Sequence, residues 1–230
     1  MMRIITWNLD YWKHRSLHNE AWIYLRDKIK PDVALLQEVS PPNLEAQEHF
    51  LFKITGRRQG TAIYTRNLPT QEFEVALPEK YVGRVVATQI EVSAGLKVVV
   101  MSVHAPIIKG RVFPYLDEIF DKIEYVVSDQ TFVVGGDLNT ARLAEKVWPG
   151  YGHGPFFERL AQSVFFDCHR KFHVAEEQTY FRSDSKQPYQ DDHLFVSCDL
   201  ADRVVCCDPI KDETTLKVSD HIPLLVEIAI

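Results

Sequence analysis

Short runs of apolar residues recur along the chain, and most of them end in polar residues. Runs rich in Val, Ile, Phe and Tyr that are bounded by Pro, Gly or Asn predict β-strands. The predicted strands span residues 3–9, 32–39, 61–66, 73–77, 84–92, 97–104, 132–134, 164–166, 178–181, 193–196, 203–207 and 224–230. A tight turn at Ser93-Ala94-Gly95 is expected to join two of them as a hairpin.

Apolar residues at three- and four-residue spacing predict helices in the longer segments. The predicted helices span residues 16–30, 115–127 and a short segment from Ser40 through about Phe52, with two more short helices between residues 141 and 162. Ser16 is the expected cap of the first helix, and Pro31 ends it. Pro114 suits the first turn of the helix that follows it.

The number and length of the strands indicate the fold class. They are too many and too short for a parallel sheet alone, so two packed sheets flanked by helices fit better. With no linker, internal repeat or low-complexity tract between the elements, residues 1–230 are predicted to form one α/β domain. A chain of 230 residues, 46% of them apolar, is long enough to bury a sizeable core.

Charge and cysteine content limit the function classes. The net charge of −6 argues against attachment to nucleic acid by bulk charge, although a local basic patch is compatible with it. No apolar run is long enough for a membrane span, and the first residues do not form a secretory signal. Cys168, Cys198, Cys206 and Cys207 lack a Cys-x-x-Cys pair, which favours free thiols in a reducing compartment. We therefore expect a cytoplasmic protein. We also expect a monomer, and no protein partner is predicted.

The segment 132–140 is the most informative stretch of the sequence. A buried strand leads into Gly135-Gly136, and then Asp137 and Asn139 follow at a spacing that puts both side chains on one face of an extended backbone. The glycines leave room for a polar group beside the backbone. A carboxylate beside an amide suits metal and phosphoryl chemistry, since the carboxylate takes a proton or binds a hard cation.

Polar side chains of the same kinds stand at the ends of other predicted strands. They are Asn8, Asp10, Glu38, His104, Asp137, Asn139, Asp192, Asp220 and His221. Taken singly, each could be a cap, a turn residue or a solvated strand end. Because strand ends in an α/β fold meet at one edge of a sheet, the whole set predicts a single site there.

The residue types at these positions indicate a reaction class. Hard oxygen ligands favour magnesium, manganese or calcium over zinc, and no serine or cysteine has the pattern of a nucleophile elbow. Histidines near carboxylates suit proton transfer or stabilisation of a charged phosphoryl group. The combination predicts metal-assisted hydrolysis of a phosphate ester by water.

Six short motifs in this order resemble the endonuclease/exonuclease/phosphatase superfamily, typified by deoxyribonuclease I. They are Thr6-Trp7-Asn8, Leu35-Leu36-Gln37-Glu38-Val39, Ser102-Val103-His104-Ala105-Pro106, Gly135-Gly136-Asp137-Leu138-Asn139, Asp192-His193-Leu194-Phe195-Val196-Ser197 and Ser219-Asp220-His221. The resemblance runs from residue 6 to residue 221. It implies a four-layered α/β sandwich, with two mixed sheets face to face and helices outside, and a divalent-metal phosphoesterase that uses Mg²⁺ or Mn²⁺.

The resemblance also implies roles for the metal side of the site. Glu38 would be the main metal ligand, with Asn8 close to the metal and the substrate phosphate. Asp220 would support this metal or a second cation. Asp10 is included among the candidate metal ligands, because the Asn8-x-Asp10 spacing resembles the abasic-endonuclease branch.

On the catalytic side, the resemblance implies that Asp137 orients or deprotonates the attacking water and that Asn139 holds the phosphate. Asp192 would pair with His221, which would act on the phosphoryl group as a base or as a charged stabiliser. His104 resembles the second histidine of the deoxyribonuclease and sphingomyelinase branches. In deoxyribonuclease I that histidine has a glutamate partner, for which this sequence offers no clear candidate.

Basic and aromatic residues near these motifs bear on the substrate. Lys13-His14-Arg15, Lys109 with Arg111, and Arg57-Arg58 could bind an anionic substrate or simply face solvent. The loop 148–153 could stack a base or sugar, or pack as core or lid. A nuclease or nucleic-acid phosphodiesterase is the first hypothesis. A phosphatase or phosphodiesterase of a small molecule or lipid headgroup is the second.

A third hypothesis is a binding domain that keeps the fold without catalysis. Such a domain is expected to lose part of the catalytic set. The chain retains Glu38, Asp137, Asn139, Asp192 and His221. The sequence therefore favours an enzyme.

Overall fold

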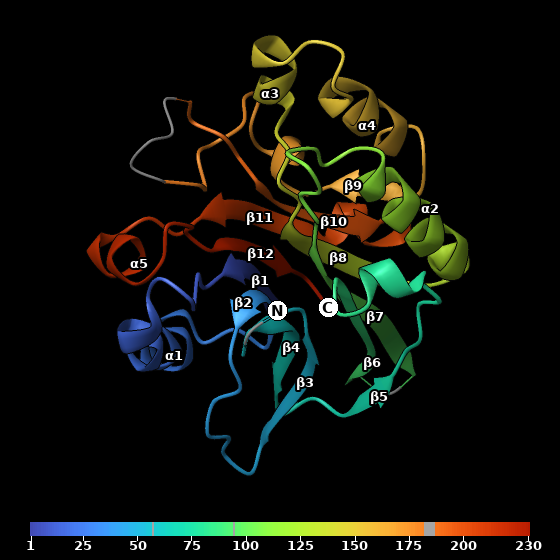
Figure 1. Cartoon of the computed structure of the whole chain (residues 1–230). Coiled ribbons are helices and arrows are strands. Elements are labelled where there is room, and N and C mark those ends of the chain that lie inside the picture. Colours follow the sequence, from blue (N-terminus) through green and yellow to red (C-terminus); the bar gives the residue numbers. More distant parts are fainter. Residues whose placement is uncertain (57, 94, 182–186) are drawn as a thin grey trace.

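Two mixed β-sheets packed face to face form the centre of the protein (Figure 1). The computed structural model describes residues 1–56, 58–93, 95–181 and 187–230. Within these residues each sheet has six strands, in the orders β11-β12-β1-β2-β4-β3 and β5-β6-β7-β8-β10-β9. Helices cover the outer faces, so the predicted four-layered α/β sandwich is confirmed.

The first sheet contains both ends of the described chain. Its strands are β1 (Met2–Asn8), β2 (Val33–Val39), β3 (Glu48–Ile54), β4 (Gly60–Arg66), β11 (Val204–Pro209) and β12 (Leu224–Ile228). β1 and β2 are parallel, and the other neighbours are antiparallel. Since β1 pairs with β12, the two termini lie close together (Figure 1).

The second sheet is built from the middle of the chain. Its strands are β5 (Thr70–Glu72), β6 (Val85–Ser93), β7 (Leu96–His104), β8 (Phe132–Asp137), β9 (Phe165–Asp167) and β10 (Asp192–Ser197). β7 and β8 are parallel, with His104 opposite Asp137, and β10 is antiparallel to β8, with Asp192 opposite Asp137. Three predicted site residues therefore lie side by side on neighbouring strands.

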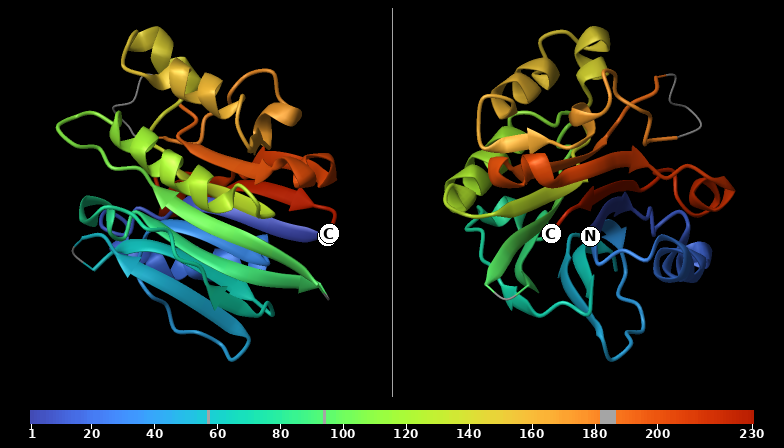
Figure 2. Two further views of the ribbon diagram at one scale, coloured as in Figure 1. Left: turned by 90° about the vertical axis from the view of Figure 1, so that its right-hand side faces the viewer. Right: turned by 180° about the vertical axis from the view of Figure 1, so that it is seen from behind.

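The helices lie on opposite outer faces of the two sheets (Figure 2). They are α1 (His18–Tyr24), α2 (Tyr115–Val127), α3 (Arg142–Val147), α4 (His153–Leu160) and α5 (Glu213–Val218). Short 3₁₀ turns span Arg15–Leu17, Glu79–Tyr81, His169–Lys171 and Cys198–Arg203, and a π-helical turn spans Leu25–Ile29. Among the described helices, none combines the length and the apolar character needed to cross a membrane.

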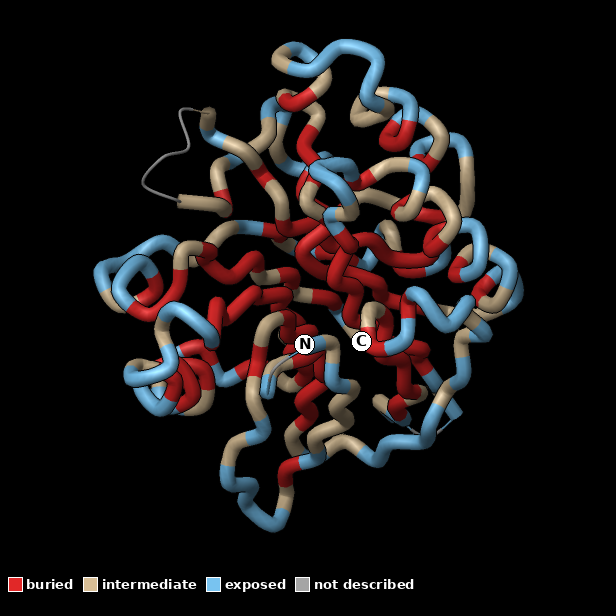
Figure 3. Tube along the Cα trace, in the orientation of Figure 1, coloured by how far each residue is buried: buried red, intermediate tan, exposed pale blue. Residues whose placement is uncertain are grey.

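Apolar side chains form three buried layers that hold this arrangement together. One lies between the sheets, one packs α1 on the first sheet, and one packs α2 and α4 on the second. The buried positions concentrate in the strands, and the exposed ones lie around the periphery (Figure 3). Burial of this much apolar surface is the main driving force for the fold.

Two strand and helix predictions are wrong in ways that have a physical reason. The segment predicted as a helix through Phe52 is strand β3, which pairs with β4 along its whole length. Its aromatic residues Phe50 and Phe52 pack against the apolar layer between α1 and the first sheet. Pairing with β4 and this packing therefore outweigh the local helical pattern. Residues 73–77 are extended without ladder bonds, and Phe73, Val75 and Leu77 alternate toward the core as a strand would.

Other boundaries also differ from the predictions. The first helix begins at His18 after a 3₁₀ turn, so Ser16 is not its cap, and it ends in a π-turn with Lys30 in the left-handed region. Residues 178–181 were predicted as a strand and do not form one; Tyr180 makes an isolated β-bridge to His221. Helix α5, which the sequence pattern missed, starts at a capping box in which the Asp212 carboxylate accepts from the backbone N–H of Thr214 and Thr215. The predicted helix 115–127 is confirmed as α2.

Candidate active site

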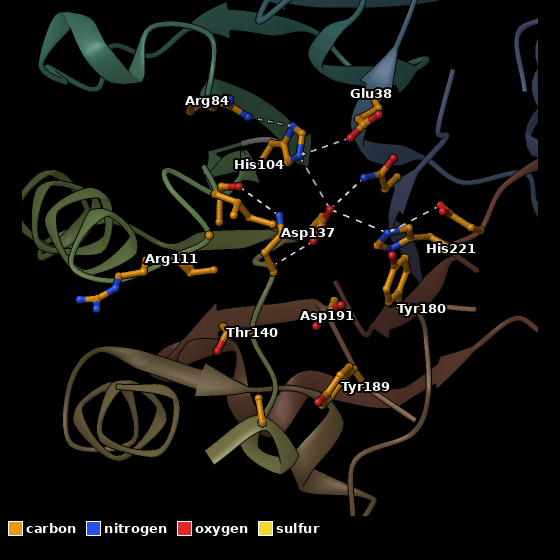
Figure 4. Close-up of a pocket in the computed structure, with 18 of the residues that line it drawn as sticks. Glu38, Arg84, His104, Arg111, Asp137, Thr140, Tyr180, Tyr189, Asp191 and His221 are labelled. Carbon is orange, nitrogen blue, oxygen red and sulfur yellow. Dashed lines mark hydrogen bonds and ion pairs between the residues drawn. The ribbon is translucent and has the colours of Figure 1, made fainter. Parts of the chain in front are cut away.

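A cleft of about 1020 Å³ opens at one end of the two sheets, where the predicted strand ends meet (Figure 4). Most of the predicted site residues line it: Asn8, Asp10, Glu38, His104, Asp137, Asn139, Asp220 and His221. Asp192 is fully buried and lies behind His221. The structure thus brings together residues that are spread over nearly the whole chain.

Asp137 lies at the centre of this cleft. Its Oδ2 accepts a hydrogen bond from Asn8 Nδ2 at 2.8 Å, and its Oδ1 accepts one from the Asn139 backbone N–H at 3.0 Å. The Nε2 atoms of His104 and His221 lie 3.8 and 3.9 Å from Oδ2 (Figure 4). The carboxylate is therefore fixed by two donors, with one histidine on each side.

Irregular backbone at the strand ends turns these side chains into the cleft. A register shift separates Leu36 and Val39 on β2, and Glu38 within it has a positive φ of 47°. Asp10 and Asn139 also have positive φ values, of 40° and 50°. A left-handed conformation costs free energy for a residue with a side chain, and such strain concentrates at functional sites.

His221 is held by Asp192, a carboxylate that is completely buried. The Nδ1 atom of His221 lies 2.8 Å from Asp192 Oδ2, and the Tyr180 ring packs 4.8 Å from the imidazole. Burial acts to lower the pKa of His221, but attraction to Asp192 and Asp137 outweighs it and raises this pKa to about 10. At neutral pH His221 is therefore an imidazolium, whose Nε2 lies 3.9 Å from Asp137 Oδ2 and 4.0 Å from Asp220 Oδ1.

His104, in contrast to His221, is neutral at pH 7. Burial lowers its pKa to about 4, and the nearby Arg84 adds to this effect. The Arg84 guanidinium lies 3.4 Å from His104 Nδ1 (Figure 4). If Nδ1 accepts this contact, Nε2 carries the proton and faces the Asp137 and Glu38 carboxylates at 3.8 and 3.7 Å. His104 therefore has an arginine neighbour where deoxyribonuclease I is expected to have a glutamate.

Glu38 has the surroundings expected of a ligand to a hard cation. Its Oε2 accepts from Gln59 Nε2 at 3.1 Å, while no hydrogen bond to Oε1 is found within the described residues. Burial raises the pKa of Glu38, and repulsion by Asp137 and Asp10 raises it further. A divalent cation would relieve this repulsion, and the donor set of carboxylate and amide oxygens fits Mg²⁺.

Asp10 and Asp220 form a second acidic group at the edge of the cleft. Lys13 Nζ donates to both, at 3.2 Å to Asp10 and 2.8 Å to Asp220, and His14 Nδ1 lies 3.1 Å from Asp10. Burial raises the pKa of Asp10; the bond from Lys13 lowers the pKa of Asp220 although burial opposes it. Lys13, predicted as a contact for an anionic substrate, therefore already neutralises two carboxylates.

Asn139 is partly engaged by the backbone of a neighbouring strand end. Its Nδ2 donates to the carbonyl of Ala105 at 3.0 Å. One N–H of this amide remains for a ligand in the cleft. The amide is fixed in orientation at the position where the sequence predicts a phosphate contact.

Arg84, Tyr189 and Asp191 are among the lining residues that the sequence did not predict as site residues. Asp191 is the first residue of the Asp191-Asp192 pair, and burial, followed by repulsion from Asp137, raises its pKa to about 8. Tyr189 lies beside it on the cleft wall (Figure 4). The acidic doublet was the available signal for Asp191, and the predicted hairpin of strands 84–92 and 97–104 was the signal for Arg84, because it pairs Arg84 with His104.

The outer rim of the cleft is basic and aromatic. The Arg111 guanidinium lies 5.6 Å from the centre of the Tyr151 ring, and Trp148 contacts Tyr151 edge to face. Trp12 and Trp148 are both more than half exposed, at 54% and 53%. Arg15 and Lys109, which were predicted with these groups, do not line the cleft, and Arg57 and Ala94 lie outside the described residues.

Two packed mixed sheets that carry carboxylates, amides and histidines at one end are typical of phosphoester hydrolases with the deoxyribonuclease I-like fold. The model of the endonuclease/exonuclease/phosphatase family matches residues 5–221, and the chain belongs to this family. The predicted resemblance is therefore confirmed. No protein with a curated description matches the chain by sequence.

Solved structures with the same fold include three nucleic-acid enzymes. An AP endonuclease from Archaeoglobus fulgidus has a TM-score of 0.76 and 21% identity, with 100% of both chains covered. The 3′ phosphatase NExo from Neisseria, bound to a product DNA hairpin, has a TM-score of 0.76, 18% identity and 100% coverage of both chains. An AP endonuclease from Leishmania major has a TM-score of 0.73 and 18% identity, covering 98% of this chain and 86% of its own. At these identities the likeness establishes the fold.

Proposed function

We propose that residues 1–230 form one catalytic unit that hydrolyses a phosphodiester with an activated water, in a reaction that depends on Mg²⁺ or Mn²⁺. The main support for this proposal is the position of Asp137, which lies between a neutral His104 and a charged His221. A proton acceptor and a cationic donor thus lie 3.9 Å apart in one cleft. Membership of the endonuclease/exonuclease/phosphatase family supports the same reaction class.

The metal ligands proposed are Glu38 first, then Asn8, Asp10 and Asp220. The bound cation would act as a Lewis acid that polarises the phosphoryl group. Asn8 has a further role in this arrangement, because its amide donates to Asp137 and its Oδ1 accepts from the Asp10 backbone N–H at 2.9 Å. Asn8 would therefore fix the position of Asp10, a proposed metal ligand, relative to Asp137, the proposed base for the water.

The remaining roles follow from the charge states. Asp137 orients the attacking water and takes its proton, because it is the acceptor fixed at the centre of the cleft. His221 donates from Nε2 to the phosphoryl oxygens, and Asp192 fixes its orientation. His104 donates from Nε2, and Asn139 binds a phosphoryl oxygen with its remaining N–H. The water oxygen bonds to phosphorus, and the bond to the leaving oxygen breaks.

Nucleic acid is the proposed substrate class. Exposed aromatic residues beside a phosphate site provide surfaces on which any base can stack. Trp148 and Tyr151 lie on the rim of the cleft together with Arg111. The Neisseria enzyme with the same fold is described as bound to a product DNA hairpin. We infer that this chain takes an unpaired or terminal nucleotide into the cleft and binds few phosphates outside it.

A small-molecule phosphoester is the second candidate. The cleft volume of about 1020 Å³ is at the upper end of small-molecule sites, and the net charge of −6 disfavours a long polyanion. This alternative keeps the same metal and the same catalytic residues. It differs only in what the aromatic rim contacts.

The first experiment compares hydrolysis of bis-p-nitrophenyl phosphate and p-nitrophenyl phosphate, each with Mg²⁺, Mn²⁺ or EDTA. We expect cleavage of the diester that EDTA abolishes and that His221→Ala lowers by about 10²- to 10⁴-fold. His49→Ala, at an exposed histidine of β3, is the matched control and should leave the rate unchanged. Substantial activity in His221→Ala, or activity in EDTA, would contradict the proposal.

Salt dependence then separates the two substrate classes. For a DNA or RNA substrate, log kcat/KM should fall linearly with log salt concentration, with a slope near the number of phosphates bound. A small-molecule substrate should give a slope near zero. Preference for the monoester would favour the phosphatase alternative.

A further inference from the structure

A second group of metal-ligand side chains lies outside the residues that line the cleft. His169 belongs to the 3₁₀ turn after β9, and His173 and Glu177 follow it at four-residue spacing. The backbone N–H of His173 bonds to the carbonyl of His169 at 3.0 Å, which puts both rings on one side of a helical turn. One ligand atom from each of the three residues lies within 4.8 Å of the other two.

His169 is a buried side chain with unused polar atoms. It is only 1% exposed, and neither Nδ1 nor Nε2 has a hydrogen-bond partner in the part of the chain that is described. Leaving a buried polar atom unpaired destabilises the fold, so such a group needs an explanation, and a bound ion is one. Here both nitrogens are unpaired, and the ring stacks on that of His173 with 4.3 Å between centres.

His173 has the contacts that a metal-binding histidine normally has. Its Nδ1 lies 3.1 Å from Glu177 Oε1. Its Nε2 lies 2.9 Å from Asp208 Oδ1 and 3.1 Å from the carbonyl of Cys207. Histidine ligands usually donate their second ring N–H to a carboxylate or a backbone carbonyl, which fixes the tautomer. With Nδ1 facing Glu177, both acceptors for Nε2–H are already in place.

We propose that His169, Nδ1 of His173 and Glu177 bind one zinc-class divalent cation, with water completing a tetrahedral set. Two imidazoles and a carboxylate suit Zn²⁺ and its analogue Co²⁺, whereas Mg²⁺ prefers oxygen ligands alone. Bonds of about 2.0–2.1 Å in tetrahedral geometry put neighbouring ligand atoms about 3.4 Å apart. The observed 3.1 Å between His173 Nδ1 and Glu177 Oε1 is close to this separation.

Closing the site requires one movement. The two imidazole planes are nearly parallel, at 19°, so their lone pairs do not yet converge. The His169 ring has to turn out of the stack toward Glu177. Because neither of its nitrogens is hydrogen-bonded, turning it breaks no hydrogen bond. Glu177 is exposed, and its carboxylate can follow the ion.

An ion pair alone explains less of the geometry. A protonated His173 between Glu177 and Asp208 would account for the contacts of that ring. It would leave both nitrogens of the buried His169 unpaired. A bound cation gives His169 a partner and retains the bond from His173 to Asp208.

The position of this site indicates a structural role. Thr179 follows two residues after Glu177, and its Oγ1 accepts from the backbone N–H groups of Asp191 and Asp192, both at 3.1 Å. Its carbonyl accepts from the backbone N–H of Ile222 at 2.9 Å. A cation at Glu177 would anchor the segment that positions Asp192 against His221, without touching the cleft.

Cobalt absorption tests the site independently of catalysis. The Glu38→Gln protein, which lacks the main ligand proposed for the cleft, is titrated with Co²⁺ and then with Zn²⁺. We expect one equivalent of Co²⁺ with the intense visible bands of a tetrahedral site, which Zn²⁺ removes. Oxygen-only octahedral sites give much weaker bands, so residual binding in the cleft does not imitate this result.

Variants then assign the ligands. Glu177→Ala and His173→Ala, both made in the Glu38→Gln protein, should abolish the bands. Glu177 is exposed and His173 is partly exposed, so neither change opens the core. Glu158→Ala and His49→Ala are the matched exposed controls and should retain the bands. Absence of intense bands at excess Co²⁺, or their persistence in both ligand variants, would overturn the proposal.

Discussion

His221 Nδ1 lies 2.8 Å from the Oδ2 atom of Asp192, and both side chains are buried. On the other side of Asp137, His104 contacts Arg84 and no hydrogen-bonded carboxylate partner is found for it in the described chain. The pKa of His221 is raised to about 10 and that of His104 is lowered to about 4. Burial at His104 and the buried carboxylate beside His221 thus give two histidines of one cleft different chemical roles.

Replacing Asp192 by Asn should remove stability in a pH-dependent way. The pKa of His221 is about 10 in the folded protein and about 6.5 in the unfolded chain. The charged His221 therefore contributes its full stabilisation of the fold below pH 6.5. This stabilisation is lost as the pH rises toward 10. Breaking a buried pair costs about 3–5 kcal/mol, so we expect a loss of this order at pH 6 that shrinks toward pH 10. Urea unfolding at both pH values measures it.

The matched control for this prediction is Asp121→Asn, which removes an exposed carboxylate that faces Arg159. Its effect should stay within about 0.5 kcal/mol at both pH values. A loss for Asp192→Asn that is equal at pH 6 and pH 10 would contradict the charged state of His221.

Arg84→Gln should raise the pKa of His104 from its low value. Burial is the main cause of the lowered pKa and remains in the variant, so the rise is expected to be partial. Titration of the imidazole by NMR measures it, with Arg66→Gln, at a partly exposed surface arginine, as the control. An unchanged pKa of His104 in this variant would show that the charge of Arg84 does not lower the pKa of His104.

Glu38→Gln should remove most of the stabilisation by Mg²⁺. A ligand at 100 times its Kd stabilises a protein by about 2.7 kcal/mol, which is a shift in Tm of several degrees. We expect such a shift in the unaltered protein and a much smaller one in Glu38→Gln. Differential scanning calorimetry with and without Mg²⁺ measures it. Glu72→Gln, an exposed change on β5, should keep the full shift, and an equal shift in Glu38→Gln would argue against Glu38 as a ligand.

Gly136→Ala should destabilise the fold next to the site. A Cβ atom at this position would lie 1.7 Å from the backbone carbonyl oxygen of Val103 on the neighbouring strand β7. Backbone cannot give way as a side chain can, so we expect a loss of about 3 kcal/mol or more. Gly56→Ala is the control, since nothing lies within 4 Å of its added Cβ. Equal unfolding midpoints in denaturant would contradict the close approach.

The order of buried segments and the polar residues that end them were readable from the sequence. Helix α2 was predicted at its observed bounds, because its apolar positions repeat with the helical period and form one buried face. The Asp137–Asn139 spacing placed the centre of the cleft at the end of β8. Such features depend on neighbours within a few residues, so a local pattern carries them.

Predictions failed where the partner of a segment is distant in the chain. Strand β3 forms because it pairs with β4 along its whole length. Residues 73–77 have no such partner among the described residues, although partly buried and exposed residues alternate along them. Helix α5 is an exception, because its capping box lies within residues 212–215 and is a local signal. The predicted hairpin places Arg84 opposite His104, but only the structure shows that the guanidinium lies 3.4 Å from Nδ1 of this histidine.

The sequence by itself determined the family, the layered sandwich and the set of polar strand ends. Only the tertiary structure decided how these residues are charged and which of them meet. Asn8 and Asp137, 129 residues apart, share a hydrogen bond of 2.8 Å. The pKa values of His104 and His221 diverge because burial dominates at His104 and attraction to Asp192 and Asp137 dominates at His221. Burial and charge depend on neighbours in space, and a linear pattern specifies those neighbours only after the sheets have packed.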